Sequence, residues 1–163
     1  MNRRFLTVLV SAAAGIAALA FAVAPARALP SPQTSTITVT AQVAKSCSMS
    51  NGTLDFAAYD PNAPAPRDVP TTFSVNCTKG TTGTISLDAG ANGGRNMKGT
   101  GANTDLLKYE LYSDAGHTSV WDATNTKTAT GPGVTMTIFG RIQPGLFVSA
   151  DSYSDSVTAT ITF

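Results

Sequence analysis

Apolar and polar side chains alternate one by one in an early segment of the chain, residues 36–43. Ile37, Val39, Ala41 and Val43 fall on one face of an extended backbone, and Thr and Gln occupy the other. This two-residue period, rich in β-branched side chains, is typical of a strand with one buried face. The alternation continues beyond residue 43 without a break, so the pattern alone does not fix where this strand ends.

The same period returns at the other end of the sequence. In residues 156–163, Val157, Ala159, Ile161 and Phe163 alternate with Ser and Thr. Strand-like runs also occur between the two ends, at residues 72–77, 83–87, 107–112 and 134–140. No window shows the i, i+3, i+4, i+7 apolar spacing of a helix that would be stable in water. The pattern therefore predicts an all-β protein.

Turn-forming residues separate these runs, for example at Asn51-Gly52 and in the glycine-rich residues 89–94. Short strands joined by such turns are typical of a sandwich or a barrel. Residues 60–70 hold four prolines, and proline cannot donate a ladder hydrogen bond. We therefore expect that segment to be an extended crossover rather than a central strand, within one β-sandwich domain.

Four of the aromatic residues could serve either as core residues or as a binding surface. They are Tyr109, Tyr112, Trp121 and Phe139. We expect them to be core residues, and the alternative is a flat platform that binds a sugar.

The N-terminus has the features of a secretory signal peptide. A short basic start precedes an alanine-rich apolar stretch over residues 5–24, and Ala26 and Ala28 give a small-x-small cleavage pattern. The alternative is an uncleaved membrane anchor, because the apolar stretch is about long enough to span a bilayer. The alanine content and the adjacent cleavage pattern favour a signal peptide of residues 1–28, and hence export.

Charge narrows the class of partner. Three of the eleven Lys and Arg residues lie in the signal peptide, so the mature chain has eight basic and ten acidic residues, a net charge of −2. A weakly acidic chain has no electrostatic attraction for nucleic acid or for an anionic membrane. We therefore exclude both as partners and expect the chain to bind other proteins.

Cys47 and Cys77 are the only cysteines. An even count in an exported chain predicts a disulfide, and closing the 30-residue loop would stabilise the fold by roughly 3–4 kcal/mol. The alternative, a two-thiol metal or redox site, needs a closer spacing or histidine ligands, and His117 is the only histidine. We therefore expect a disulfide and no metal site.

No set of residues indicates an enzyme. His117 lies in a turn-like sequence without a recognisable nucleophile or proton-transfer partner. Asp55, Asp60 and Asp68 lack the dense spacing of a calcium-binding loop. Arg95 follows two glycines and is expected to be a turn residue that pairs with a carboxylate or a carbonyl. We expect no catalytic residue and no cofactor.

A set of short motifs runs through the chain in a characteristic order. The motifs are Lys45-Ser46-Cys47-Ser48-Met49, Leu54-Asp55-Phe56, Val75-Asn76-Cys77, Ile85-Ser86-Leu87-Asp88, Arg95-Asn96-Met97, Leu107-Lys108-Tyr109-Glu110-Leu111-Tyr112, Trp121-Asp122, Phe139-Gly140-Arg141-Ile142 and Tyr153-Ser154-Asp155-Ser156-Val157. Together they resemble the spore coat protein U domain across nearly the whole mature chain. Each motif is weak by itself, but the ordered set is specific. This family is shared with the archaic, Csu-type chaperone–usher pilins.

The resemblance implies an immunoglobulin-like sandwich that lacks its final strand. In such pilins a periplasmic chaperone lends the missing strand, and in the fibre the N-terminal extension of the next subunit replaces it. For this chain the resemblance implies that residues 34–41 are the donor strand, presenting Ile37, Val39 and Ala41. It also implies that one wall of the acceptor groove is made by alternate residues of the last strand: Val157, Ala159, Ile161 and Phe163.

The resulting plan has a signal peptide at 1–28, an N-terminal extension with the donor strand at 29–41 and a pilin domain at 42–163. The implied function is that of an exported structural subunit of an extracellular pilus that supports adhesion or biofilm formation. The implied partners are a periplasmic chaperone, an outer-membrane usher and other pilin subunits. The alternative is a spore-coat or cell-surface matrix protein of the same fold without pilus assembly.

Overall fold

Alternating sequence segments form ten β-strands in the computed structural model, which describes Arg27 and residues 31–163. The signal peptide predicted for residues 1–28 lies outside the described residues except for Arg27. The strands are β1 (Cys47–Met49), β2 (Arg67–Cys77), β3 (Thr82–Leu87), β4 (Asn96–Gly99), β5 (Leu106–Lys108), β6 (Glu110–Tyr112), β7 (Lys127–Thr130), β8 (Val134–Ile142), β9 (Tyr153–Ser154) and β10 (Ala159–Thr162). Among the described residues, there is no helix that is both long and apolar enough to cross a bilayer.

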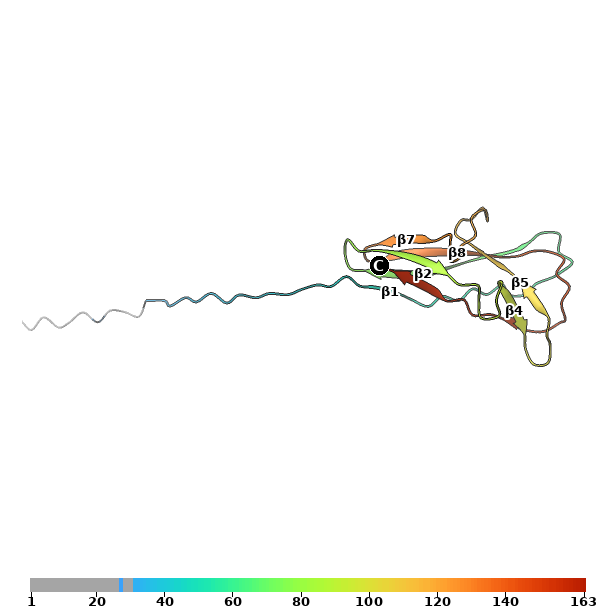
Figure 1. Ribbon diagram of the computed structural model, residues 1–163, viewed down its shortest axis with the longest axis horizontal. Helices are drawn as coiled ribbons and strands as arrows, with labels where there is room; N and C mark the ends of the chain where they lie inside the picture. Colours follow the sequence, from blue (N-terminus) through green and yellow to red (C-terminus); the bar gives the residue numbers. More distant parts are fainter. Residues whose placement is uncertain (1–26, 28–30) are drawn as a thin grey trace, which may run out of the picture. The chain divides into compact units, whose positions relative to one another are not determined.

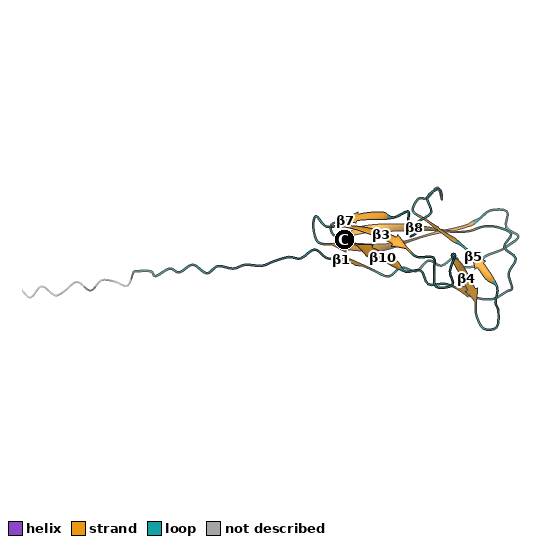
Figure 2. Cartoon of the chain, viewed as in Figure 1, coloured by secondary structure: helices purple, strands orange, loops and turns teal. Residues whose placement is uncertain are grey.

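The strands pair into three antiparallel sheets (Figures 1 and 2). The first has the order β1–β2–β8–β6, the second β10–β3–β7 and the small third β5–β4–β9. The longest pairing joins β2 to β8, from Arg67 opposite Ile142 to Val75 opposite Val134. The prediction of an all-β sandwich is confirmed.

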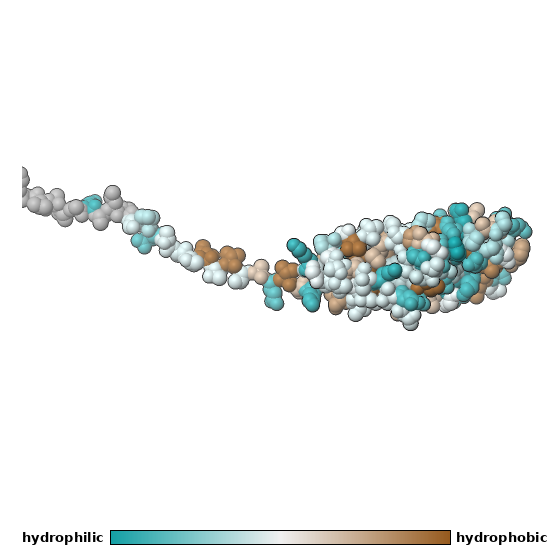
Figure 3. Space-filling model, turned by 90° about the horizontal axis from the view of Figure 1, so that it is seen from above, coloured by the Kyte–Doolittle hydropathy of each residue, from teal (hydrophilic) through white to brown (hydrophobic). Residues whose placement is uncertain are grey.

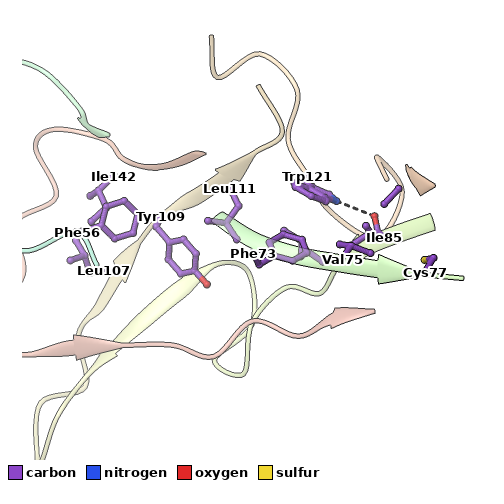
Figure 4. Close-up of a cluster of buried hydrophobic side chains, with 12 residues drawn as sticks. Phe56, Phe73, Val75, Cys77, Ile85, Leu107, Tyr109, Leu111, Trp121 and Ile142 are labelled. Atoms are coloured by element: carbon purple, nitrogen blue, oxygen red, sulfur yellow. Dashed lines mark hydrogen bonds between the residues drawn. The ribbon is translucent and has the colours of Figure 1, made fainter. Parts of the chain in front are cut away.

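Burial follows the two-residue period that the sequence shows. Phe73 and Val75 in β2 are buried, as are Ile85 and Leu87 in β3, while the intervening polar residues are exposed or half-buried. Figure 4 shows the resulting cluster of apolar side chains. Each large side chain that is fully buried stabilises the fold by about 1.5–3 kcal/mol.

Trp121 is a core residue, as predicted. Its side chain is completely buried, and its indole N–H donates to the Ile85 carbonyl over 3.0 Å. Tyr109 is also buried, but Tyr112 and Phe139 are only half-buried.

Two segments differ from the sequence-based expectation. Residues 36–43 form no strand, because among the described residues they have no strand partner. Residues 67–70 do belong to a strand, so the prediction that 60–70 lies wholly outside the central strands was wrong. Pro70 is tolerated because β1 reaches only Val75–Cys77, which leaves β2 with β8 as its one neighbour at the proline.

The run at 107–112, expected to be one strand, is divided between two sheets. β5 ends at Lys108 and β6 begins at Glu110, and Tyr109 between them donates its amide to the Arg95 carbonyl. The short strands β4, β7 and β9 were not predicted, because two to four mostly polar residues carry too little alternation to identify. Their pairing is fixed by neighbours far away in the sequence.

Candidate functional site

An open groove of about 820 Å³ runs between the edges of the two main sheets. One wall is formed by β1 and the loop after it, residues 47–54, and the other by residues 153–159 with Ile161. Between the walls the groove reaches core side chains: Phe73, Leu87, Met97, Tyr109 and Leu111. Figure 4 shows three of these, Tyr109, Leu111 and Phe73, close together in the buried cluster.

The strands at the groove are edge strands, and they differ chemically from the other edges. β1, β9 and β10 each have a neighbour on only one side within the described chain, and none of them contains a charged residue. The remaining edges, β5, β6 and β7, contain Lys108, Glu110 and Lys127 respectively. Charged side chains discourage a further strand from pairing at an edge. The three uncharged edges all border the groove.

Three of the four predicted acceptor residues lie together in this groove. Val157, Ala159 and Ile161 line it, whereas Phe163 does not and has 56% of its surface exposed. Ile161 packs directly over Gly83, where an added Cβ would lie 2.5 Å from its Cδ1. Glycine at position 83 therefore allows this wall to approach β3 closely.

Sequence reasoning did not identify the opposite wall. Met49 and Leu54 line the groove there, and Leu54 and Phe56 pack over Gly140 of β8. A Cβ at Gly140 would lie 2.7 Å from Leu54 and 2.8 Å from Phe56. The alternation of Leu54-Asp55-Phe56 is a weak signal of this packing.

Asp155 holds the groove wall in place. Its carboxylate accepts hydrogen bonds from the Tyr109 hydroxyl at 2.7 Å and from both the amide and the side chain of Asn92 at 3.1 Å. Burial and the neighbouring Asp155 carboxylate raise the pKa of Tyr109 well above its usual range, so its hydroxyl remains a donor. These hydrogen bonds connect the wall at Asp155 to Tyr109 at the base of the groove and to the turn at residues 90–92.

A second carboxylate, Asp88, fixes the next part of the same wall. It accepts from the Thr158 amide and the Gly90 amide, each at 2.9 Å. These hydrogen bonds lower the pKa of Asp88 below its usual value. Residues 155–158 therefore keep an extended course although they have no regular strand pairing.

The disulfide between Cys47 and Cys77 is present, as predicted. The two residues are directly opposite each other in β1 and β2, with their Cα atoms 4.0 Å apart. Cys47 also lines the groove. The disulfide thus connects the short β1 wall covalently to the long central strand.

The predicted donor residues are exposed. The chain divides into two units, Met1–Thr40 and Ala41–Phe163, and the described residues 31–40 of the first contain no strand. Ile37 and Val39 are 82% and 87% exposed, and Ala41 is exposed as well. Apolar side chains are visible along this segment in Figure 3. Their donor role remains a prediction.

His117 belongs to a packed cluster rather than to an open turn. Its ring contacts the edges of Tyr112 and Phe139, with ring centroids 5.1 and 6.2 Å away. Its Nδ1 lies 3.1 Å from Arg141, which forms two 2.7 Å hydrogen bonds with Asp68. These hydrogen bonds lower the pKa of Asp68. The cluster joins β2, β6 and β8 to the loop after β6.

The carboxylates considered as calcium ligands have local structural roles. Asp55 and Asp60 each accept the backbone amide two residues later. In the described part of the chain, no group of three or more His, Cys, Asp or Glu side chains is placed to hold a metal ion. Arg95 lies in the turn before β4 and donates to the Trp121 carbonyl at 2.9 Å, in agreement with its expected turn position and pairing, and its side chain is buried.

Known proteins share both the sequence and the fold. The chain is 34% identical over 145 residues to Protein U of Myxococcus xanthus, a match that covers 76% of this chain and 80% of that protein. Its fold is similar to a chain in the crystal structure of the CsuC–CsuE chaperone–tip adhesion subunit pre-assembly complex from archaic chaperone–usher Csu pili of Acinetobacter baumannii. That match has a TM-score of 0.51 at 23% identity and covers 74% of this chain but only 40% of the other. The Spore Coat Protein U domain profile matches residues 33–160, so the chain belongs to the Spore Coat Protein U domain family.

Proposed function

We propose that this chain is an exported structural subunit of a chaperone–usher pilus, completed in the fibre by a strand from another subunit. The observation that carries the proposal is the groove between uncharged edges, since β1 and β10 each have only one neighbouring strand among the described residues, which leaves an edge where a further strand can pair. Adhesion and biofilm formation are the roles that such a fibre would support.

The donor would be residues 34–41, in the exposed N-terminal segment. Ile37, Val39 and Ala41 repeat with the same two-residue period as the groove-lining Val157, Ala159 and Ile161. Burying Ile37 and Val39 would contribute about 1.5–3 kcal/mol each, in addition to the new backbone hydrogen bonds. Because each subunit donates one surface and accepts at another, the contact is heterologous and builds an open filament.

The proposed partners follow from this open groove between strand edges. Before assembly the groove requires a temporary strand, which a periplasmic chaperone would lend, and an outer-membrane usher would exchange it for the donor of the next subunit. The site has strand edges that can form hydrogen bonds and walls that contain both apolar and polar side chains, and its proposed role is binding rather than catalysis. No cofactor is part of the proposal.

Deleting residues 29–40 tests the proposal. The shortened subunit is expected to be recovered as a complex with its chaperone but to form no fibre, because it retains the groove and lacks the donor. Size-exclusion chromatography and electron microscopy would measure this, with the unaltered chain as control. Fibres of normal length from the shortened subunit would rule out the donor assignment.

The alternative is a coat or surface-matrix protein of the same fold. The description of the matching family as a spore coat protein domain favours this possibility. The two can be separated by expressing the full chain alone and with a periplasmic pilus chaperone. A stable soluble monomer without the chaperone would favour the matrix protein, and dependence on the chaperone would favour the pilin.

A further inference from the structure

The domain displays large apolar side chains at both of its ends. Phe147 is 74% and Leu106 is 49% exposed at one end, and Val43 is 79% exposed at the other, where Phe163 also lies. Single exposed apolar residues are common, but here they occur at the two ends that a head-to-tail filament would bring together.

Phe147 projects from a loop that is otherwise anchored. Leu146 and Val148, on either side of it, pack against the core. The Leu146 amide donates to the Tyr59 hydroxyl over 3.0 Å. The alternation of the loop directs position 147 to solvent, where a polar residue would fit equally well, so packing within the domain does not explain the phenylalanine.

This loop lies just beyond one end of the groove. It follows Ile142, which is opposite the first residue of β2, whereas Cys47 is opposite the last residue of β2. At about 3.3 Å per residue these ends are ~33 Å apart. Tyr153 lines the groove, and its hydroxyl donates to the Ser149 carbonyl of the loop over 2.7 Å.

Val43 belongs to the disulfide end of the domain. The carbonyl of the next residue, Ala44, accepts from the Thr78 hydroxyl, beside Cys77. Val43 is also only two residues beyond Ala41, the last predicted donor residue. A donor strand in a neighbour's groove would therefore carry its own Val43 to within about 7 Å of the position of Ala41.

The direction of the donor strand decides where Val43 would arrive. If the donor runs antiparallel to β10, its C-terminal end, which carries Val43, lies toward Tyr153 and the loop that holds Phe147. If the donor runs parallel to β10, Val43 instead approaches Phe163. The first arrangement covers Phe147 with the incoming subunit.

We propose that Val43 of one subunit packs against Phe147 of the subunit whose groove holds its donor strand. The contact is a second interface between two copies of the chain, and it rests on the proposed pilin function. Without this contact, two successive domains would be joined only by the donor strand and the short connection between Ala41 and Cys47. The contact would therefore limit the rotation of one domain relative to the next.

Paired cysteines test the contact in fibres of the full chain. Under mild oxidation, Val43→Cys with Phe147→Cys is expected to give a ladder of covalent oligomers on a non-reducing gel. The matched control is Val43→Cys with Phe163→Cys, and each single substitution controls for mispairing with the native disulfide. A ladder only in the control pair, or none in either pair from normal fibres, would overturn the proposal. Absence of fibres from the unaltered chain would instead refute the pilin function, and this contact with it.

A second variant distinguishes the proposed subunit contact of Phe147 from a role of this residue in adhesion. Fibres of Phe147→Ser are expected to dissociate in denaturant about tenfold faster or more, as loss of one buried aromatic contact predicts. Binding of a synthetic peptide of residues 34–41 to the groove of the same variant should not change. If the fibres are as resistant as unaltered ones but no longer bind an apolar solid surface, Phe147 serves adhesion and the proposal is wrong.

Discussion

The two long edges of the sandwich are finished in different ways. At one edge, formed by β6 and β7, the chain after β6 returns and closes the gap between the sheets. At the other, formed by β1 and β10, the gap remains as the 820 Å³ groove. The same fold therefore contains a closed edge and an open edge.

The closed edge shows what completes such a gap. Val120 forms a bridge with Tyr112, and the Trp121 amide donates to the Leu111 carbonyl of β6 at 2.8 Å. The indole of Trp121 fills the space between the sheets and reaches Ile85 in the second sheet. Backbone pairing and an inserted apolar side chain act together.

At the open edge, β1 and β10 are strands to which a further strand could pair. No segment of residues 41–163 fills the groove between them. A strand with alternating apolar side chains is the element that would supply both backbone pairing and filling, and Ile37 and Val39 are of that kind. The comparison indicates that an incomplete edge is a local feature of this fold, since the opposite edge is completed by the chain itself.

Breaking the closed edge is expected to have the largest effect on stability. Trp121→Ala removes the buried indole and leaves the Ile85 carbonyl without its donor, so the free energy of unfolding should fall by about 3–5 kcal/mol. Guanidinium unfolding followed by far-ultraviolet circular dichroism would measure this. Phe147→Ala, at an exposed position, is the control and should change stability by less than about 0.5 kcal/mol. A loss below about 1 kcal/mol for Trp121→Ala would mean that the indole does not close this edge.

Releasing one wall of the open edge should have a slightly smaller effect. Replacing Cys47 and Cys77 together by Ser is expected to lower the free energy of unfolding by roughly 3–4 kcal/mol, because the 30-residue loop is no longer closed in the unfolded chain. The same variant should bind the peptide of residues 34–41 more weakly, since Cys47 lines the groove. Isothermal titration calorimetry would measure binding, and unchanged affinity would show that the disulfide does not position the β1 wall.

Weakening the proposed insert should affect assembly and leave the domain intact. Ile37→Ser and Val39→Ser are each expected to destabilise the fibre by about 1.5–3 kcal/mol, because each removes one apolar side chain from the filled groove. Thr38→Ser, on the opposite face of the donor, is the matched control. The denaturant concentration at which the fibres dissociate would rank the variants by stability. If Thr38→Ser and Ile37→Ser destabilise the fibre equally, the assigned inward face of the donor is wrong.

Lowering the pH is expected to have the smallest of these effects, a local destabilisation of the closed edge. The Asn125 and Thr124 amides and the Thr124 hydroxyl donate to Asp122, next to Trp121, and lower its pKa to about 2. The stabilisation is complete above the ordinary value near 4 and is lost as the pH falls toward 2. Asp122→Asn should flatten this part of the pH dependence. Amide hydrogen exchange of residues 120–126 between pH 5 and 2.5 would measure it, and an unchanged profile in the variant would exclude Asp122 as the cause.

One wall of the open edge was anticipated, because the family resemblance assigned alternate residues of the last strand to it. The alternation of Val157, Ala159 and Ile161 is local, and those three side chains do line the groove. The opposite wall was missed because β1 is only three residues long and is positioned by its pairing with β2, while Leu54 after it is positioned by the space above Gly140. Asp155 was missed because its partners, Tyr109 and Asn92, lie 46 and 63 residues away.

Local periodicity and composition were sufficient to determine the all-β class and the disulfide, since each depends on neighbouring residues or on a residue count. Tertiary structure decided which strands became edges, that 107–112 is divided at Tyr109, and that Trp121 closes one side while the other stays open. These features depend on backbone partners distant in sequence, and a two-residue period specifies which face is buried but not which strand lies beside it.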